Sequence, residues 1–381
     1  MAPRKKKGVS WFLRIAIASN VFFALLLLLS YLSPVVKPAS SWPLIFLGIV
    51  YPVLFWFNFV FVIFWFFYNW RFASLSLFAI IVGYSNFFNY ISFGKSSKAF
   101  GPEMTTIKVL SYNVRNFDFF SSPSRQNPNF ENRNKIFDFL VGEDFDIICF
   151  QEYIHDNSKK FKTTDTLRKI LRANNVHFEH SKSRGSLFFG LATYSSSPIL
   201  NKGRIEFPSM AGNLGIYTDV MVNTDTIRIY NIHLESIGLG KEDIMLFDNM
   251  LSADDEMGNM DHSVGLRRIA RRIRDAAVRR TVQAKIVSEH IEASPYPVIL
   301  AGDFNDTPFS YGYRKIKRNL KDSYKKGIDI GGSTYIWNFP SFRIDFLLYS
   351  QGLKAKNFKT GKQKYSDHYP ISVTFALAEK N

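Results

Sequence analysis

The first hundred residues of this 381-residue chain contain no aspartate and no glutamate, although the chain has 32 acidic residues in all. Nine of the 48 basic residues lie there, so the remainder carries 39 basic and 32 acidic residues, or +7 of the net charge of +16. Long uncharged apolar stretches in that region exclude a purely soluble protein. The residues after them are numerous enough for one large domain with its own core.

Cysteine is almost absent, because Cys149 is the only one in the chain. An intrachain disulfide and a cysteine-based zinc site are therefore excluded. Cys149 lies in the apolar segment DIICF, where a buried thiol is poorly ionised, so we expect it to pack in the core. The sequence also lacks GxxxxGK[ST], GxGxxG and G-x-S-x-G, the motifs of phosphate loops, dinucleotide sites and serine nucleophiles.

Three apolar stretches fill most of the first hundred residues, at 11–32, 43–67 and 72–93. Each exceeds the ~20 residues that a helix needs to cross a bilayer, and the first contains a single charge, Arg14, near its end. They predict an all-α membrane anchor of three transmembrane helices over residues 1–93, with the lipid bilayer as its partner. The polar segment 94–106 then reads as a linker to a domain at 107–381.

The basic segment Arg4–Lys7 predicts the topology of this anchor. By the positive-inside rule the N-terminus stays in the cytoplasm, and three spans place the following domain on the other side. A cleaved signal peptide with its apolar region at 15–29 would leave that domain on the same outer side. If two of the runs instead form a re-entrant pair, the domain lies in the cytoplasm.

After the linker, short strands rich in Val, Ile and Phe alternate with helical patterns. Some strands are continuously apolar and some alternate, so we expect mixed sheets in an α/β (α+β) domain. Strands are predicted at 107–113, 146–151, 186–194, 215–222, 226–233, 297–301, 343–349 and 370–376, and helices at 132–141, 164–174 and 264–293.

Acids, amides and histidines lie at the ends of these predicted strands. Strand ends are where open α/β folds place their sites, and carboxylate and amide oxygens suit Mg²⁺. One such residue alone is easily explained as a turn former, a surface charge or a core histidine, but eight at six strand ends indicate a site. The eight are Asn113, Glu152, His233, Asp303, Asn305, Asp345, Asp367 and His368.

The segments around these residues resemble the motif series of the endonuclease/exonuclease/phosphatase superfamily, over Ile107 to about Leu377. They are SYNVRNF, CFQEY, YNIHLES, LAGDFNDTP, RIDFLLYS and YSDHYPI, in that order. The resemblance implies a deoxyribonuclease-I-like, four-layer α/β/β/α sandwich of two mixed sheets. With its apolar N-terminal part, the chain resembles membrane-anchored bacterial members, which implies an inner-membrane protein with an extracytoplasmic catalytic domain.

The same resemblance implies a metal-dependent phosphoesterase that uses Mg²⁺, for which Mn²⁺ can substitute. Its substrate is a nucleic acid, a phospholipid or a small phosphoester, cleaved by in-line attack of an activated water, and no obligate protein partner is evident. By motif position, Asn113, Glu152 and Asp367 act at the metal, Asp303 orients or deprotonates the water, and Asn305 binds phosphate. Asp345 orients His368, His233 is a general acid or phosphate ligand, and Arg280 and Asn231 are assigned to substrate binding.

A second hypothesis belongs to a different class of function. The same fold could serve as a catalytically silent, membrane-tethered binding module. The complete set of acids, amides and histidines argues against it, because a silent descendant would be free to lose those groups. Measured turnover on any phosphoester discriminates the two.

Two further segments stand out by charge. Residues 264–293 carry eight basic and three acidic residues with an apolar stripe at helical spacing. They predict either a solvated helix packed on a sheet or a contact with anionic headgroups or a polyanion. Residues 240–261 carry seven acids and four of the eight methionines. They predict a surface insertion, or a lid over the site.

Overall fold

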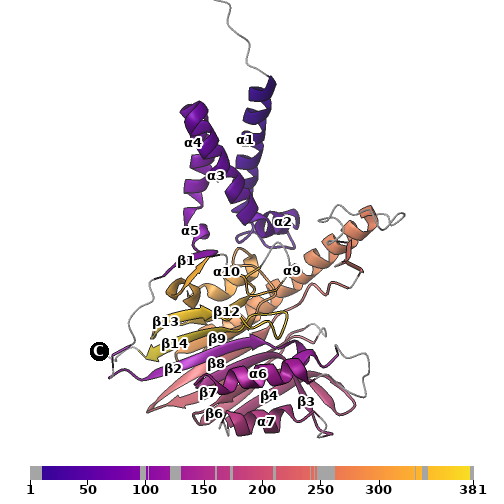
Figure 1. Ribbon diagram of the computed structural model, residues 1–381, viewed down its shortest axis with the longest axis vertical. Coiled ribbons are helices and arrows are strands. Elements are labelled where there is room, and N and C mark those ends of the chain that lie inside the picture. The colour runs from indigo at the N-terminus through magenta and orange to yellow at the C-terminus, as the bar shows by residue number, and fades with distance from the viewer. Residues whose placement is uncertain are drawn as a thin grey trace, which may run out of the picture. The chain divides into compact units, whose positions relative to one another are not determined.

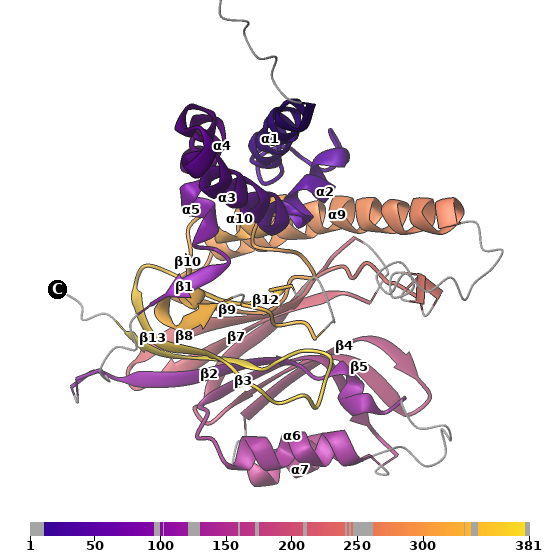
Figure 2. The ribbon, with the colours of Figure 1, turned by 45° about the horizontal axis from the view of Figure 1, so that its top comes forward.

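A computed structural model of the whole chain is shown in Figures 1 and 2. It divides into two compact units, Met1–Asn89 with Phe309–Tyr311, and Tyr90–Pro308 with Gly312–Asn381. The structure describes residues 11–94, 100–101, 103–120, 130–158, 161–171, 175–208, 212–240, 242–243, 245–246, 262–330, 332–336 and 342–377.

The first unit is helical. By length and composition, two of its helices are apolar and long enough to cross a membrane, α1 (Trp11–Ser30) and α3 (Tyr51–Tyr68). α4 (Trp70–Val82) has 13 residues and covers about 20 Å at 1.5 Å per residue, less than the ~30 Å of a hydrocarbon core. Two short helices complete the unit, α2 (Pro43–Ile49) and α5 (Tyr84–Phe87).

The third apolar run, residues 72–93, is not the single helix that the sequence predicts. α4 ends at Val82 with Gly83 as its C-cap, and the last three residues form β1 (Ile91–Phe93), which pairs with β11 (Ile328–Ile330) in the second unit. Glycine is a poor helix former, and Ser and Asn side chains in the next residues compete for backbone hydrogen bonds. A hydropathy profile detects neither the glycine nor the competing side chains, and it therefore does not predict that the helix ends at Val82.

A polar contact joins the three long helices of the first unit. The hydroxyl of Ser76 on α4 lies within hydrogen-bonding distance of Oδ1 of Asn20 on α1 and of Asn58 on α3. Nδ2 of Asn58 donates to the carbonyl of Phe23 at 3.0 Å. The buried amide of Asn58 therefore packs between helices, as polar residues do in apolar surroundings.

The second unit contains two six-stranded mixed sheets (Figure 1). One has the order β10-β12-β9-β8-β7-β6, and the other has the order β13-β14-β2-β3-β5-β4. The first comprises β6 (Ile199–Ile205), β7 (Leu214–Val222), β8 (Asp225–His233), β9 (Val298–Asp303), β10 (Lys321–Asp322) and β12 (Asp345–Tyr349). The second comprises β2 (Thr106–Asn113), β3 (Ile147–Asp156), β4 (Asn175–Arg184), β5 (Leu187–Ser195), β13 (Leu353–Thr360) and β14 (Ile371–Leu377).

Helices cover the outer faces of the two sheets, which gives the expected four layers (Figure 2). The outer helices are α6 (Glu131–Val141) and α7 (Thr163–Ile170) on one face and α9 (His262–Glu292) on the other. α10 (Tyr311–Lys317) and two short 3₁₀ helices, η1 (Arg115–Asp118) and η2 (Ser323–Lys326), complete the described elements.

The central strands are apolar on both faces because both faces are buried. On β2, Val109 packs between the sheets while Leu110 packs under α6. On β9, Ile299 faces the other sheet and Leu300 faces α9. The thiol of Cys149 is also buried between the sheets, and that burial raises its pKa to about 12, which confirms a packing role.

Each sheet contains one parallel pair, β2 with β3 and β8 with β9. The carboxyl ends of parallel strands lie at the same edge of a sheet. His233 at the end of β8 is therefore the direct neighbour of Asp303 at the end of β9, and Asn113 ends β2 beside Gln151 of β3. Stacking the two sheets brings these ends together.

Candidate active site

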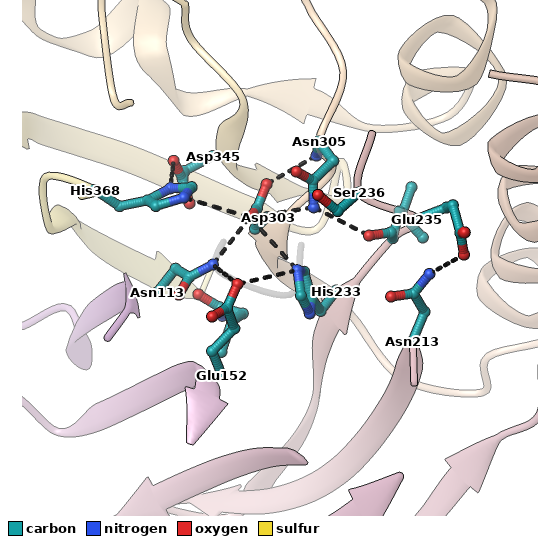
Figure 3. A network of polar contacts seen from close by, with 12 residues as sticks. Asn113, Glu152, Asn213, His233, Glu235, Ser236, Asp303, Asn305, Asp345 and His368 are labelled. Carbon is teal, nitrogen blue, oxygen red and sulfur yellow. Dashed lines mark hydrogen bonds and ion pairs between the residues drawn. The ribbon is translucent and has the colours of Figure 1, made fainter. Parts of the chain in front are cut away.

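Asn113, His233 and Asp303 end the strands β2, β8 and β9, and Glu152 lies within β3. Figure 3 shows the side chains of these four residues pointing toward one another. Nδ2 of Asn113 donates to Oδ2 of Asp303 at 3.0 Å and to Oε1 of Glu152 at 3.2 Å. Nε2 of His233 lies 3.7 Å from Oδ2 of Asp303 and 3.8 Å from Oε1 of Glu152. An amide, two carboxylates and an imidazole from both sheets thus share one centre.

Glu152 enters this centre through a β-bulge. The pairing of β3 with β5 shifts between Phe150 and Tyr153, and Glu152 has a φ of +48°. A bulge adds one residue to a strand and re-aims its side chain. Regular alternation would send Glu152 and Cys149 to opposite faces at that point, whereas the bulge turns the carboxylate to the rim, where a third of it is exposed.

Asp303 is almost fully buried in the middle of the group. Burial raises the pKa of its carboxyl to about 6; His368 and His233 act against that rise and Asp345 adds to it. The backbone N–H of Asn305 donates to Oδ1 of Asp303 at 2.8 Å. A carboxyl near its titration point at neutral pH suits the transfer of a proton from water.

His368 and Asp345 form a second pair beside Asp303. Nδ1 of His368 donates to Oδ2 of Asp345 at 2.9 Å, and its Nε2 lies 3.7 Å from Oδ2 of Asp303. Burial alone would lower the pKa of His368, but the carboxylates of Asp345 and Asp303 outweigh burial and raise it to about 10. The imidazole therefore presents Nε2 to the centre as a fixed hydrogen-bond donor.

The donor set fits a divalent metal ion. Within the described residues, Asp303, Asp345 and His368 form one group whose ligand atoms lie within 4.8 Å of one another. Since Nδ1 of His368 is held by Asp345, we read this trio as an oriented hydrogen-bonded unit. Glu152 offers carboxylate oxygens at the more open side of the centre, the donors that Mg²⁺ prefers. Asn113 turns its amide nitrogen to the centre, while its Oδ1 accepts the N–H of Arg115 at 3.0 Å, so binding a metal through that oxygen would require its amide to turn.

An unsatisfied nitrogen marks the side where a ligand would bind. Nε2 of His233 is buried and has no hydrogen-bond partner among the described residues. Native structures seldom leave such an atom unpaired, so it indicates a group that arrives with a metal or a substrate.

Two of the predicted residues, Asp367 and Asn305, lie at the edge of the centre. The carboxylate of Asp367 lies 3.6 Å from Nε of Arg115, and burial raises its pKa, with Glu152 adding to the rise against His368. Nδ2 of Asn305 donates to the carbonyl of Leu234 at 3.0 Å and to Asp303 at 3.3 Å. Phosphate binding by Asn305 would require it to exchange one of these bonds.

The structure gives Asn231 a different place from the substrate contact that the sequence predicts. Its side chain is buried between the sheets, and its amide nitrogen donates to the carbonyls of Phe150 and Ala192, each at 3.1 Å. Its oxygen accepts Nε2 of Gln151 at 2.7 Å. Both amide hydrogens are used, so Asn231 links the two sheets below the site.

Arg280 also acts through the protein rather than at the centre itself. It is buried, with Nη1 donating to the carbonyl of Glu235 at 2.8 Å and Nε donating to Asp306 at 3.1 Å. Gln283, three residues on, accepts the N–H of Glu235 at 2.9 Å. Helix α9 therefore holds the segments that follow His233 and Asp303.

Sequence reasoning missed several residues around the centre. The ring of Tyr335 meets the ring of His368 edge-on at 5.0 Å, and Asn213 donates to the buried carboxylate of Glu235. Arg115 could have been predicted from the sequence, because it lies two residues after Asn113 in the segment SYNVRNF. No sequence pattern could have predicted Tyr335 and Asn213, because they lie in loops that are far along the chain from Asn113 and Glu152.

The basic helix α9 is partly neutralised by acids. Arg268 and Arg272 bind Asp243 at 2.9 and 3.0 Å, and Arg279 binds Glu235 at 2.8 Å. These pairs favour the solvated-helix interpretation over a free polyanion surface. Most of the acidic segment, residues 247–261, lies outside the described residues, so its role as a lid stays a prediction.

Two family models match the chain. The first, described as the Endonuclease/Exonuclease/phosphatase family, matches residues 110–368. The second, a domain of unknown function, matches residues 13–90. No curated protein matches the chain.

Solved structures with the same fold are numerous. An endonuclease/exonuclease/phosphatase from Beutenbergia cavernae aligns with a TM-score of 0.52 and 15% identity, over 72% of each chain. A family protein from Bacteroides thetaiotaomicron aligns with a TM-score of 0.51 and 18% identity, over 73% of this chain and all of that one. The human Nocturnin catalytic domain aligns with a TM-score of 0.50 and 15% identity, over 72% of this chain and 96% of that one. At these identities the likeness confirms the four-layer fold.

Proposed function

Because the chain belongs to the endonuclease/exonuclease/phosphatase family, we propose that it is a membrane-anchored, Mg²⁺-dependent phosphoesterase that hydrolyses a phosphodiester or a phosphomonoester. The family assignment already makes it a hydrolase that acts on phosphoester bonds, and the fold agrees. We further propose that the enzyme depends on Mg²⁺, that it is anchored in a membrane, and that single residues have the roles given below.

The nucleophile is a water molecule positioned by Asp303. Its carboxylate lies at the middle of the group, held by Asn113 and by the N–H of Asn305. It accepts a proton from the water as the new P–O bond forms in line with the bond that breaks. Holding water and phosphate at fixed positions removes much of the entropic cost of the reaction.

Two imidazoles then oppose the charge that develops. The carboxylate of Asp345 holds the ring of His368 in place and keeps it protonated. His368 can then donate a hydrogen bond from Nε2 to a phosphoryl oxygen. His233 donates a proton to the leaving oxygen, which would otherwise depart as a costly alkoxide. The buried and unpaired Nε2 of His233 supports this role.

A magnesium ion would be held by Glu152 and Asn113, with Asp367 near a second position. When bound, it supplies positive charge to the phosphoryl oxygens, which are most negative in the transition state.

The first unit supports the membrane anchor. Only 17% of the most apolar window of α1 and 28% of that of α3 are buried, whereas a helix in a soluble core would be mostly covered. Large apolar side chains such as Trp11, Phe66 and Phe67 are exposed. We propose that this unit crosses the inner membrane of a bacterium with the N-terminus inside and the catalytic domain outside.

The observation that carries the proposal is the convergence of His233, Asp303 and Glu152 within 4 Å around an unpaired imidazole nitrogen. The test uses the full chain purified in detergent, offered a chromogenic phosphodiester, a monoester, plasmid DNA and sphingomyelin, with Mg²⁺ or with EDTA. We expect Mg²⁺-dependent turnover of at least one, lost in Asp303→Ala and kept in the surface control Asp144→Ala.

A catalytically silent binding module on the same fold is the second candidate. It predicts no turnover of any of the four substrates under either condition. That result would sink the phosphoesterase proposal, provided that circular dichroism shows a folded protein.

A further inference from the structure

A pocket of about 450 Å³ opens directly beside the candidate active site. Its lining includes Glu152 and His233 of the centre, and also Lys182, Arg184, Phe120 and Phe189. Its volume falls within the about 300–1,000 Å³ of ordinary small-molecule sites. The roles derived for the catalytic groups use none of these four residues.

Two cations line this pocket, and neither has a carboxylate partner in the part of the chain that the structure describes. Lys182 and Arg184 lie two residues apart on the edge strand β4, so their side chains share a face. Among the described residues neither forms an ion pair, although most arginines of α9 do. Two unpaired cations at the mouth of a pocket raise its affinity for an anion.

Glycines fix the positions of these cations. A Cβ on Gly190 would lie 1.9 Å from the carbonyl oxygen of Glu179, so only glycine lets β4 approach β5 this closely. There the pairing shifts between His180 and Lys182, next to the bulge that carries Glu152. Gly212 has a φ of +87°, and a Cβ on it would lie 2.3 Å from Cε of Lys182. The stem of Lys182 therefore rests on Gly212.

Two aromatic rings lie beside the cations. Phe189 is the cross-strand neighbour of Lys182, and its ring stacks on Phe120 with 5.8 Å between centroids and 26° between planes. Phe120 is 47% exposed. An exposed ring in a pocket offers a flat apolar face to a planar group of a ligand.

We propose that this pocket is a substrate-recognition subsite that takes a planar ring and a second anionic group, the combination that a nucleotide with a further phosphate offers. The inference rests on the proposed phosphoesterase function and specifies its substrate class. The ring would lie on Phe120 and the anion between Lys182 and Arg184, while the scissile phosphate lies at His233. A choline headgroup fits less well, because both cations would repel its positive charge.

The experiment compares dithymidine monophosphate with the same dinucleotide carrying a terminal phosphate at its 5′ or 3′ end. Methyl p-nitrophenyl phosphate reports on the catalytic centre alone. We expect the full chain with Mg²⁺ to prefer one phosphorylated dinucleotide roughly tenfold in kcat/KM, and Lys182→Ala/Arg184→Ala to remove that preference. Phe120→Ala should lower kcat/KM for all dinucleotides about tenfold and leave their ratio unchanged.

The matched control is Lys359→Ala/Lys362→Ala, which removes the same charge from a different cavity and should keep the preference. All variants should hydrolyse methyl p-nitrophenyl phosphate at the wild-type rate. A preference that is absent in the wild type, or that survives in Lys182→Ala/Arg184→Ala, overturns the subsite. Faster hydrolysis of sphingomyelin than of any dinucleotide also overturns it. No hydrolysis of any substrate overturns the phosphoesterase proposal itself, and the subsite with it.

Discussion

At the scale of single residues, the site depends on Asp303 more than on any other side chain. Its carboxylate lies within 4 Å of Asn113, His233 and His368, which come from three different strand ends or loops. Burial keeps its pKa at about 6. The same carboxylate thus organises the neighbours and is poised to accept a proton near neutral pH.

The role of His233 as a proton donor predicts a dependence on the leaving group. For a diester with an alkoxide leaving group, His233→Ala should lower kcat/KM by ~10²–10⁴. For a p-nitrophenyl diester the loss should be much smaller, because p-nitrophenolate needs no proton to leave. Steady-state kinetics on both substrates measure this, and equal losses would mean that His233 does not protonate the leaving group.

Asn231 offers a test of a positioning role against a substrate contact. Asn231→Ala would remove the buried hydrogen bonds that its side chain forms with the carbonyls of Phe150 and Ala192 and with Nε2 of Gln151, at about 0.5–1.5 kcal/mol for each bond. We expect a lower thermal midpoint and an unchanged KM. A raised KM with an unchanged midpoint would instead support the contact that the sequence predicts.

The sequence could predict the main site residues because each is a polar group within or next to an apolar strand segment. It could not separate Asn231 from His233, since residues two apart on a strand share a face. Asn231 lies two residues before the end of β8 and is buried between the sheets. This burial depends on the packing of β3 against β8, which the sequence does not reveal. The left-handed φ of Glu152 is likewise set by the bulge, which no local pattern announces.

At the scale of elements, the strands that the sequence predicts are the inner strands of the two sheets. They are apolar because both faces are buried. The sequence analysis did not predict β4 and β6, which are edge strands with polar residues such as His180, Lys182 and Lys202. Charged edges prevent pairing with other chains, and they hide the strand from a search for hydrophobicity. One of these missed strands carries the cations of the proposed subsite.

A buried ion pair between the elements predicts a pH dependence of stability. Nη2 of Arg343 lies 2.8 Å from Oδ2 of Asp322, and both are buried. Burial would raise the pKa of Asp322, but Arg343 outweighs it and lowers the pKa. Folding therefore gains stability from this carboxyl above its unfolded pKa of about 3.9, and loses it as the pH falls through lower values.

Thermal unfolding of the wild type and Asp322→Asn between pH 7 and pH 3 tests this pair. We expect the midpoint of the wild type to fall more steeply below about pH 4 than that of the variant. At neutral pH, Asp322→Asn should be destabilised by about 3–5 kcal/mol, because it removes the carboxylate that balances the buried charge of Arg343. Parallel pH profiles would contradict the proposed contribution of the pair.

At the scale of the whole molecule, the charge is divided between two functions. Nine of the basic residues lie in the first hundred residues, where we propose that they set the membrane topology. Much of the remaining excess lies on α9, where acids pair with Arg268, Arg272 and Arg279. Lys182 and Arg184 form no ion pair with any described residue, and they line the pocket beside the site, so they are a better guide to the substrate than the total of +16.

The number of membrane crossings decides the side on which the catalytic domain lies. Three crossings place it outside and two place it inside, and the short α4 leaves the third crossing as a prediction. Fusions of the C-terminus to alkaline phosphatase and to a fluorescent protein that matures only in the cytoplasm measure the side. We expect active phosphatase and a dark fluorescent fusion, whereas the opposite pattern would contradict the extracytoplasmic domain.

The most direct test of the central claim is the rate of phosphodiester hydrolysis by the full chain as Mg²⁺ is titrated, for the wild type, Asp303→Ala and Asp144→Ala. The account predicts a rate that saturates with Mg²⁺ in the wild type and in Asp144→Ala, is abolished by EDTA, and falls to background in Asp303→Ala. A rate that is equal in the wild type and Asp303→Ala, or that does not depend on Mg²⁺, would contradict it.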